Sequence, residues 1–187
     1  QWPETGMEVV ETSIPDLKII RPRVFHDDRG FFFESYNENK FAALGLPAVW
    51  RQDNHARSCR NTLRGLHFQM GKGQAKLARC VRGRVWDVAV DIRPDSPTLG
   101  RWHGVELTED NMLMFLIPEG FAHGYCVLSD EAEVLYKCST VYDPTLESEI
   151  AWNDAEIAVE WPVKEPVLSQ RDINAQSFQS YLAKVRG

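Results

Sequence analysis

The sequence predicts an all-β domain, a sandwich or barrel of antiparallel strands with small helical additions. Short segments rich in β-branched and aromatic residues follow one another at near-regular spacing, with turn residues between them. These segments are 17–25, 30–36, 49–56, 74–81, 84–93, 101–107, 111–118, 122–129, 132–140 and 149–154. Helical patterns are confined to 38–44, which Gly45 ends, and to about 174–186. No repeat or linker divides the chain, so we expect one domain over residues 7–187.

The pair Arg82-Gly83 lies between two of these segments and predicts a hairpin turn in which Gly83 takes a positive φ. We therefore expect strands that are neighbours in sequence to pair. Alternation assigns the faces, because successive side chains of a strand point to opposite sides. Asp87 and Asp91 share one face of their strand, and Tyr136 lies on a face that should be buried.

Composition limits the possible partners. The 187 residues carry a net charge of -6, which argues against general binding to nucleic acid or to a membrane surface. The four cysteines are too widely spaced for metal or redox pairs, so free thiols in a reducing cytosol are expected. Because no apolar run approaches the ~20 residues of a membrane span, we expect a soluble, cytoplasmic protein. Residues 1–6 precede Met7 and are interpreted as an expression remnant.

The histidines do not form a convincing metal site. None of the five belongs to an HxH or HExxH pair. The stretch PEGFAHG resembles the second motif of cupin barrels, with His123 at the ligand position. At the first motif, however, the sequence continues from His67 into Phe68 and Gln69, where a metal-binding cupin would have another histidine. Two scattered imidazoles fall short of the three or four ligands usual for such metals, so we expect no metal.

A local excess of basic residues suits an anionic ligand. Arg57, Arg60, Arg64, Lys76 and Arg79 fall within a short window of this acidic chain. Arginine forks match phosphate oxygens, which favours a ligand that carries a diphosphate. A solvated strand face is the simpler interpretation for the first two of these arginines and for Arg79.

Other candidates have structural explanations. Tyr136 could be a core tyrosine with its hydroxyl tied to an acceptor. Asp172 could be a helix N-cap. Glu34 and Glu147 could be surface carboxylates.

Several motifs together resemble the RmlC family, the dTDP-4-dehydrorhamnose 3,5-epimerases. They include RGLHFQ, QAKL, PEGFAHG, VLYKC and LSQRD, and the likeness runs from about residue 14 to 173. The resemblance implies a cupin-type jelly roll that acts as a homodimer without metal or organic cofactor. It also implies a nucleotide-linked substrate, a dTDP-4-keto-6-deoxyhexose.

The resemblance implies specific chemical roles. His67 of RGLHFQ would be the base that removes protons from C3 and C5, and Asp172 of LSQRD would orient it. Tyr136 of VLYKC would be the acid on the opposite face of the sugar, and Lys76 of QAKL would stabilise the enolate oxygen. These roles fit the chemistry, because deprotonation beside a ketone places negative charge on the carbonyl oxygen.

The resemblance also implies a set of residues that bind the nucleotide and the sugar. They are Gln52, Asn54, Arg64, Lys76, His123, Glu147 and Arg171, with Tyr142 stacked on the thymine ring and with Arg29 and Glu34 supplied by the partner subunit through exchanged N-terminal strands. One geometric condition follows: Arg64 and His67 face opposite sides of a regular strand, so both reach one ligand only if the chain bends at Gly65.

Three alternatives are compatible with the sequence. An epimerase that inverts only C3 would keep the same histidine, aspartate and tyrosine. A metal-dependent oxygenase would use His67 and His123 as ligands. A sugar-binding protein of the cupin type would need no catalytic base.

Overall fold

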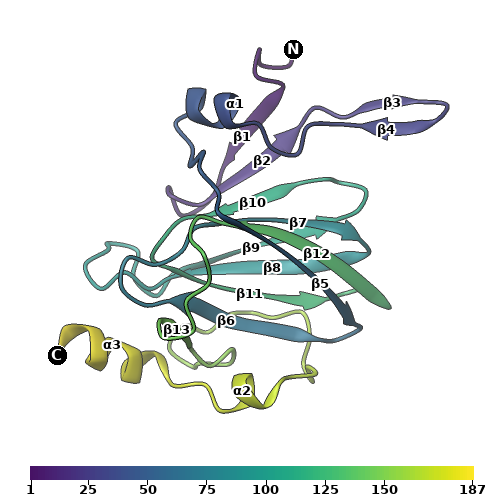
Figure 1. The fold of residues 1–187 in the computed structure, drawn as a ribbon. Coiled ribbons are helices and arrows are strands. Elements are labelled where there is room, and N and C mark those ends of the chain that lie inside the picture. Colours follow the sequence, from purple (N-terminus) through teal and green to yellow (C-terminus); the bar gives the residue numbers. More distant parts are fainter.

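The computed structural model describes all 187 residues as a jelly-roll sandwich of two antiparallel sheets (Figure 1). The first sheet has the order β1-β2-β10-β7-β12-β5 and the second the order β13-β6-β11-β8-β9. The strands of the first sheet are β1 (Met7–Glu11), β2 (Lys18–Pro22), β10 (Met114–Ile117), β7 (Lys76–Arg82), β12 (Glu131–Cys138) and β5 (Gln52–Cys59). Those of the second are β13 (Glu147–Glu149), β6 (Leu63–Gln69), β11 (Phe121–Val127), β8 (Arg84–Asp91) and β9 (Trp102–Thr108). The predicted all-β class is confirmed.

The core lies between the two sheets and continues behind the second one. Strand β8 shows why: Val85 and Ala89 face the space between the sheets, whereas Val88 and Val90 pack beneath the C-terminal segment. A strand covered on both sides carries apolar residues on both faces. Asp87, on the face toward the first sheet, is completely buried.

The predicted hairpin at Arg82-Gly83 is wrong. Gly83 does take a positive φ of +74°, but β7 pairs with β10 and β12, while β8 pairs with β11 and β9. The turn therefore carries the chain from one sheet to the other. A jelly roll pairs strands that are distant in sequence, as β5 does with β12 and β6 with β11.

Two strands were not predicted from the sequence, and one predicted strand was misplaced. β1 and β6 were not among the predicted segments. The last predicted strand, 149–154, contributes only Glu149 to β13, followed by an isolated bridge from Ile150 to Gln176.

The helices are short. α1 (Glu38–Ala43) matches the predicted 38–44 and is capped by Asn37. The predicted C-terminal run forms α3 (Phe178–Arg186), which begins later than the predicted start near 174, and a four-residue helix α2 (Gln170–Ile173) precedes that run. None of these helices has the length and apolar character to cross a bilayer.

The N-terminal residues are continuous with the first sheet. Pro3 to Gly6 form a turn, and the Gly6 carbonyl accepts a hydrogen bond of 2.9 Å from the Arg23 amide. This bond lengthens the β1–β2 ladder by one pair beyond Met7.

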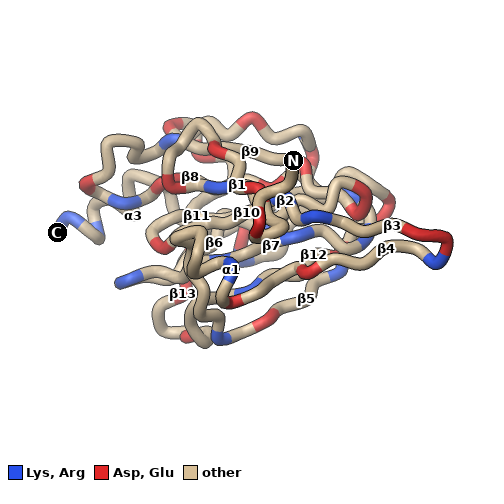
Figure 2. Tube along the Cα trace, turned by 90° about the horizontal axis from the view of Figure 1, so that it is seen from above, with Lys and Arg blue, Asp and Glu red and all other residues tan.

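A two-stranded arm projects from the body of the molecule. β3 (Phe25–Asp27) and β4 (Gly30–Phe32) pair only with each other and extend away from both sheets (Figure 1). Phe31 and Phe32 are 59% and 69% exposed. Acidic residues and one basic residue, Arg29, gather at the tip of the arm (Figure 2). The arm therefore presents exposed aromatic side chains beside a charged tip.

Candidate active site

A cavity of about 440 Å³ opens between the two sheets. Seven of the predicted site residues line it: Gln52, Asn54, His67, Lys76, Tyr136, Tyr142 and Glu147. They come from both walls, with His67 on β6 of one sheet and Lys76 and Tyr136 on β7 and β12 of the other. Residues far apart in the sequence thus meet in one concave site.

His67 is held by a carboxylate from the far end of the chain. Its Nε2 lies 2.6 Å from Oδ1 of Asp172, which is 3% exposed. The other carboxylate oxygen accepts a bond of 3.3 Å from the Gly65 amide. Burial opposes ionisation of Asp172, but the hydrogen bonds from His67 and Gly65 outweigh it and hold its pKa below the usual range. The other ring nitrogen of His67 has no hydrogen-bond partner in the protein.

Asp172 is not the N-cap of its helix. Ser169 occupies that position and accepts a hydrogen bond from the Asp172 amide. The carboxylate is thereby left free to face His67 rather than its own helix.

Strand β6 bends at Gly65 as the site requires. Opposite β11, Arg64 pairs with Tyr125 and His67 pairs with His123, so three steps on β6 match two on β11. This irregularity puts Arg64 and His67 on the same face. Gly65 has a φ of +154°, a conformation that L side chains rarely adopt.

Lys76 and Tyr136 sit side by side on the opposite wall. The ammonium of Lys76 lies 5.9 Å from the centre of the Tyr136 ring. Burial lowers the pKa of Lys76, and burial also raises the pKa of Tyr136. As the pH rises, the lysine is therefore biased to lose its proton early and the tyrosine to keep its own.

A polar network borders the cavity. Tyr142 donates from its hydroxyl to Glu147, and its amide donates to Oε1 of Gln52 at 2.8 Å. Arg171 bonds to Glu147 at 2.9 Å and to Glu149 at 2.8 Å. The Tyr142 ring is left exposed at this border. An exposed ring beside an arginine suits a planar base next to phosphates.

Not all predicted residues reach the cavity of their own chain. Arg29, on the arm, pairs with Asp27, and Glu34, just beyond the arm, pairs with Lys40. Arg64 is exposed outside the lining, where its Nε donates to Ser58 at 3.0 Å.

His123 also lies outside the lining, buried behind it. Its Nε2 is shared between the two oxygens of Asp87, at 2.8 Å and 2.9 Å. Asp87 was given no role from the sequence, although a carboxylate among the apolar residues of 84–93 was a visible signal.

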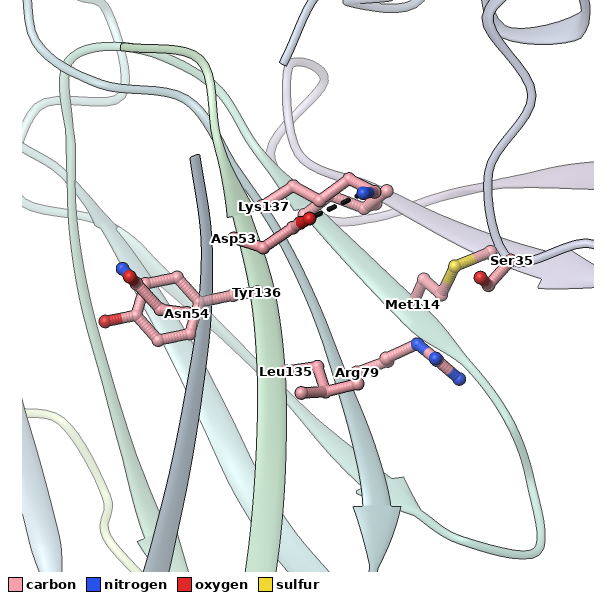
Figure 3. A pocket seen from close by; sticks show the side chains of 9 residues that line it. Ser35, Asp53, Asn54, Arg79, Met114, Leu135, Tyr136 and Lys137 are labelled. Atoms are coloured by element: carbon pink, nitrogen blue, oxygen red, sulfur yellow. Dashed lines mark hydrogen bonds and ion pairs between the residues drawn. The ribbon is translucent and has the colours of Figure 1, made fainter. Parts of the chain in front are cut away.

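A second cavity, of about 310 Å³, lies on the outer face of the first sheet. In Figure 3, Leu135 and Arg79 lie on one side of β12, whereas Tyr136 and Asn54 lie on the other. An ion pair of 3.0 Å joins Lys137 to Asp53 at this outer cavity. The predicted base His67 is absent from its lining, so the cavity between the sheets is the candidate site.

The fold and the inner cavity together define a class of protein. A histidine held by a carboxylate faces a tyrosine and a buried lysine across a concave space, within a jelly roll. This arrangement is that of an acid–base enzyme of the cupin-like class, able to take a proton from one face of a ligand and return one to the other.

Comparison with known proteins identifies the family. Residues 11–180 match the sequence profile of the family described as dTDP-4-dehydrorhamnose 3,5-epimerase, and the chain belongs to that family. The predicted family is therefore confirmed. A dTDP-4-dehydrorhamnose 3,5-epimerase of Shigella flexneri is 53% identical over 174 residues, which cover 92% of this chain and 96% of the relative.

Solved structures agree. A crystal structure of a dTDP-6-deoxy-D-glucose-3,5-epimerase from Legionella pneumophila, in complex with dTDP-4-keto-L-rhamnose, is 44% identical with a TM-score of 0.90 and covers 94% of this chain and 96% of its own. A 3'-monoepimerase from Streptomyces bikiniensis, in complex with dTDP-quinovose, is 34% identical with a TM-score of 0.87 and covers 94% of this chain and 90% of its own. The fold is thus shared by an epimerase named for two sugar carbons and by one named for a single carbon.

Proposed function

We propose that the protein inverts C3 and C5 of dTDP-4-dehydro-6-deoxy-D-glucose to give dTDP-4-dehydro-L-rhamnose. The observation that carries this proposal is the meeting of His67, held by Asp172, with Tyr136 and Lys76 on opposite walls of one cavity. Membership of the epimerase family supports the same reaction.

In the proposed mechanism, the free ring nitrogen of His67 takes the proton from C3 or C5. The C–H electrons pass into the bond toward C4, which leaves an enolate whose oxygen carries the charge. Lys76 stabilises this oxygen, and because the lysine is buried, its charge acts in a medium of low dielectric constant. Tyr136 then gives its hydroxyl proton to the opposite face of the carbon, which inverts the centre. Exchange with solvent returns both groups to their starting states. No step needs a metal or an organic cofactor.

In this proposal, residues in and around the cavity bind the substrate. Tyr142 stacks on the thymine ring, and Arg171 and Arg64 face the diphosphate. Gln52, Asn54 and Glu147 contact the nucleotide and the sugar. His123 acts from behind the lining rather than by open contact, because it is buried and already bonded to Asp87.

We also propose a homodimer in which the arm of each subunit reaches the cavity of the other. The arm extends away from both sheets (Figure 1), and its exposed phenylalanines need a partner surface. The exchange would bring Arg29 and Glu34 to the partner's site. Four free cysteines fit a working place in the reducing cytoplasm.

Deuterium uptake tests the reaction. In heavy water, the 4-keto substrate should gain label at both C3 and C5, as followed by NMR. Label at C3 alone would favour the alternative, a C3-only epimerase. The similarity of this chain to a 3'-monoepimerase is the reason to test that alternative. A freshly purified protein with stoichiometric iron would favour an oxygenase instead.

A further inference from the structure

Asp87 is a fully buried carboxylate that the proposed mechanism does not use. It lies on β8 with its side chain toward the first sheet, and its side-chain hydrogen bonds go to Nε2 of His123 alone. Because a carboxylate can only accept, the shared proton sits on Nε2 of His123. Asp87 and His123 therefore form a second histidine–carboxylate pair, and His123 lies directly opposite His67 on the neighbouring strand.

The negative charge of Asp87 is not neutralised within this second pair. Burial lowers the pKa of His123 despite the adjacent carboxylate, so the imidazole is neutral near pH 7. A buried anion whose only partner is neutral is unstable unless a cation lies nearby. The candidate cation is Lys76, because the Tyr136 ring lies 5.9 Å from the Lys76 ammonium and 6.4 Å from the ring of His123. Arg64, by contrast, is exposed outside the cavity lining.

Lys76 is a cation that lacks a bonded counter-charge. Lys76 is 9% exposed and lines the cavity, and its ammonium has no hydrogen bond or ion pair with any side chain. The groups that act on it are Cys138 and Tyr136 from β12, Asp87 from β8, His123 from β11, Glu147 from β13 and Arg171 from α2. Among the carboxylates, Glu147 is already bonded to Tyr142 and Arg171. Asp87 is the one without a cation of its own.

We propose that Asp87 is a positioning residue that acts as the buried counter-charge of Lys76 and keeps this lysine protonated at the pH of catalysis. His123 is the neutral donor that allows the carboxylate to remain in the interior, and by holding the proton on Nε2 it fixes its own tautomer. The inference rests on the proposed role of Lys76, since a neutral lysine could not stabilise an enolate oxygen in the same way.

The first test is the pH dependence of turnover in the full-length protein. In Asp87→Asn, the alkaline limb of the kcat profile should move down by about one pH unit, the order expected when one charge is removed from a partly buried site. At pH values above the wild-type limb the rate should fall about tenfold, less than the ~10²–10³-fold that follows loss of a direct oxyanion donor. Affinity for dTDP, measured by calorimetry, should change less than about twofold.

Asp91→Asn is the matched control. Asp91 lies on the same strand and face as Asp87 and is equally buried, but it bonds to Arg93, Ser96 and Thr98. Its loss should lower stability and leave the alkaline limb in place. His123→Gln keeps the carboxylate charge, so its limb should also stay in place even if its rate falls.

A second measurement does not depend on any variant of Asp87. NMR titration of the wild-type protein labelled at its lysine side chains, with Lys76→Met to assign the signal, should show Lys76 charged at pH 7. A Lys76 that is neutral at pH 7 overturns the inference. So does an unmoved alkaline limb in an Asp87→Asn protein that binds dTDP normally. If Lys76→Met is itself fully active, the fault lies instead in the proposed role of Lys76.

Discussion

Gly65 and Gly124 approach each other so closely that neither position has room for a side chain. A Cβ atom on Gly65 would lie 2.7 Å from Cα of Gly124, and one on Gly124 would lie 2.9 Å from the carbonyl oxygen of Arg64. The contact lies beside His67, at the irregularity that turns Arg64 and His67 to one face.

Gly65→Ala should therefore damage both stability and activity. We expect a loss of about 3 kcal/mol in unfolding free energy, because backbone strain adds to a steric clash. Urea denaturation would measure it. Gly71→Ala is the control: Gly71 also has a positive φ, +71°, but nothing lies near its Cβ position. Equal losses in the two variants would show that the close contact is unimportant.

His67→Asn should reduce deuterium exchange by ~10²–10⁴-fold, the usual contribution of a positioned general base. Affinity for dTDP should remain near that of the wild type, since the nucleotide contacts are elsewhere. His103→Asn, on β9 and outside the cavity lining, should be as active as wild type. Retention of exchange in His67→Asn would support a non-catalytic sugar-binding protein.

Tyr136→Phe should spare deuterium exchange more than inversion of the carbon centres, because loss of the acid leaves proton removal by His67 in place. NMR of the product mixture would separate exchange from inversion. Tyr125→Phe offers a matched control, a buried tyrosine on β11 of the other sheet that should tolerate the change. An equal loss of exchange and of inversion would argue against the role given to Tyr136.

Arm exchange predicts that two inactive variants restore each other. Co-expressed His67→Asn and Arg29→Ala subunits should give heterodimers with one complete site, and thus about a quarter of the wild-type activity in a random mixture. His67→Asn with Lys76→Met should give none, because both residues belong to the same cavity. Activity confined to monomers, or no recovery in the first mixture, would contradict arm exchange.

Asp172 should make stability depend on acid pH. Its pKa is lower in the folded state than the value of about 3.9 expected in the unfolded chain. The stabilisation is therefore complete above the unfolded-state pKa and is lost as the pH falls through the folded-state pKa. Asp172→Asn should cost about 2 kcal/mol at pH 7 and converge with wild type at acid pH. Exposed Asp110→Asn should follow the wild-type curve throughout.

Local patterns predicted most of the strands and α1, because alternation and the stop at Gly45 are properties of neighbouring residues. Which strands pair with each other could not be predicted from such local patterns. β7 and β8 are adjacent in sequence but lie in different sheets, since each finds partners that are distant along the chain. β6 was missed because Gly65 and the bend beside it interrupt the alternating pattern.

The candidate site residues were predicted from the family motifs and not from the spacing of residues along the chain. His67 and Asp172 are 105 positions apart, and no periodicity connects them. Asp87 was given no role from the sequence, because alternation assigns a side chain to one face of a strand but does not show whether that face is buried or exposed to solvent. Its burial depends on the packing of the second sheet against the first.

The carboxylate that holds His67 stands on the four-residue helix α2, only fifteen residues before the end of the chain. A nascent chain that has emerged through β13 would already contain every strand of both sheets, yet its histidine would lack this partner. Turnover would thus begin only after α2 has been synthesised, and proteolytic cleavage between β13 and α2 would silence the protein while leaving the strands in place. Enzymatic activity should consequently serve as a sensitive reporter of an intact connection between β13 and α2.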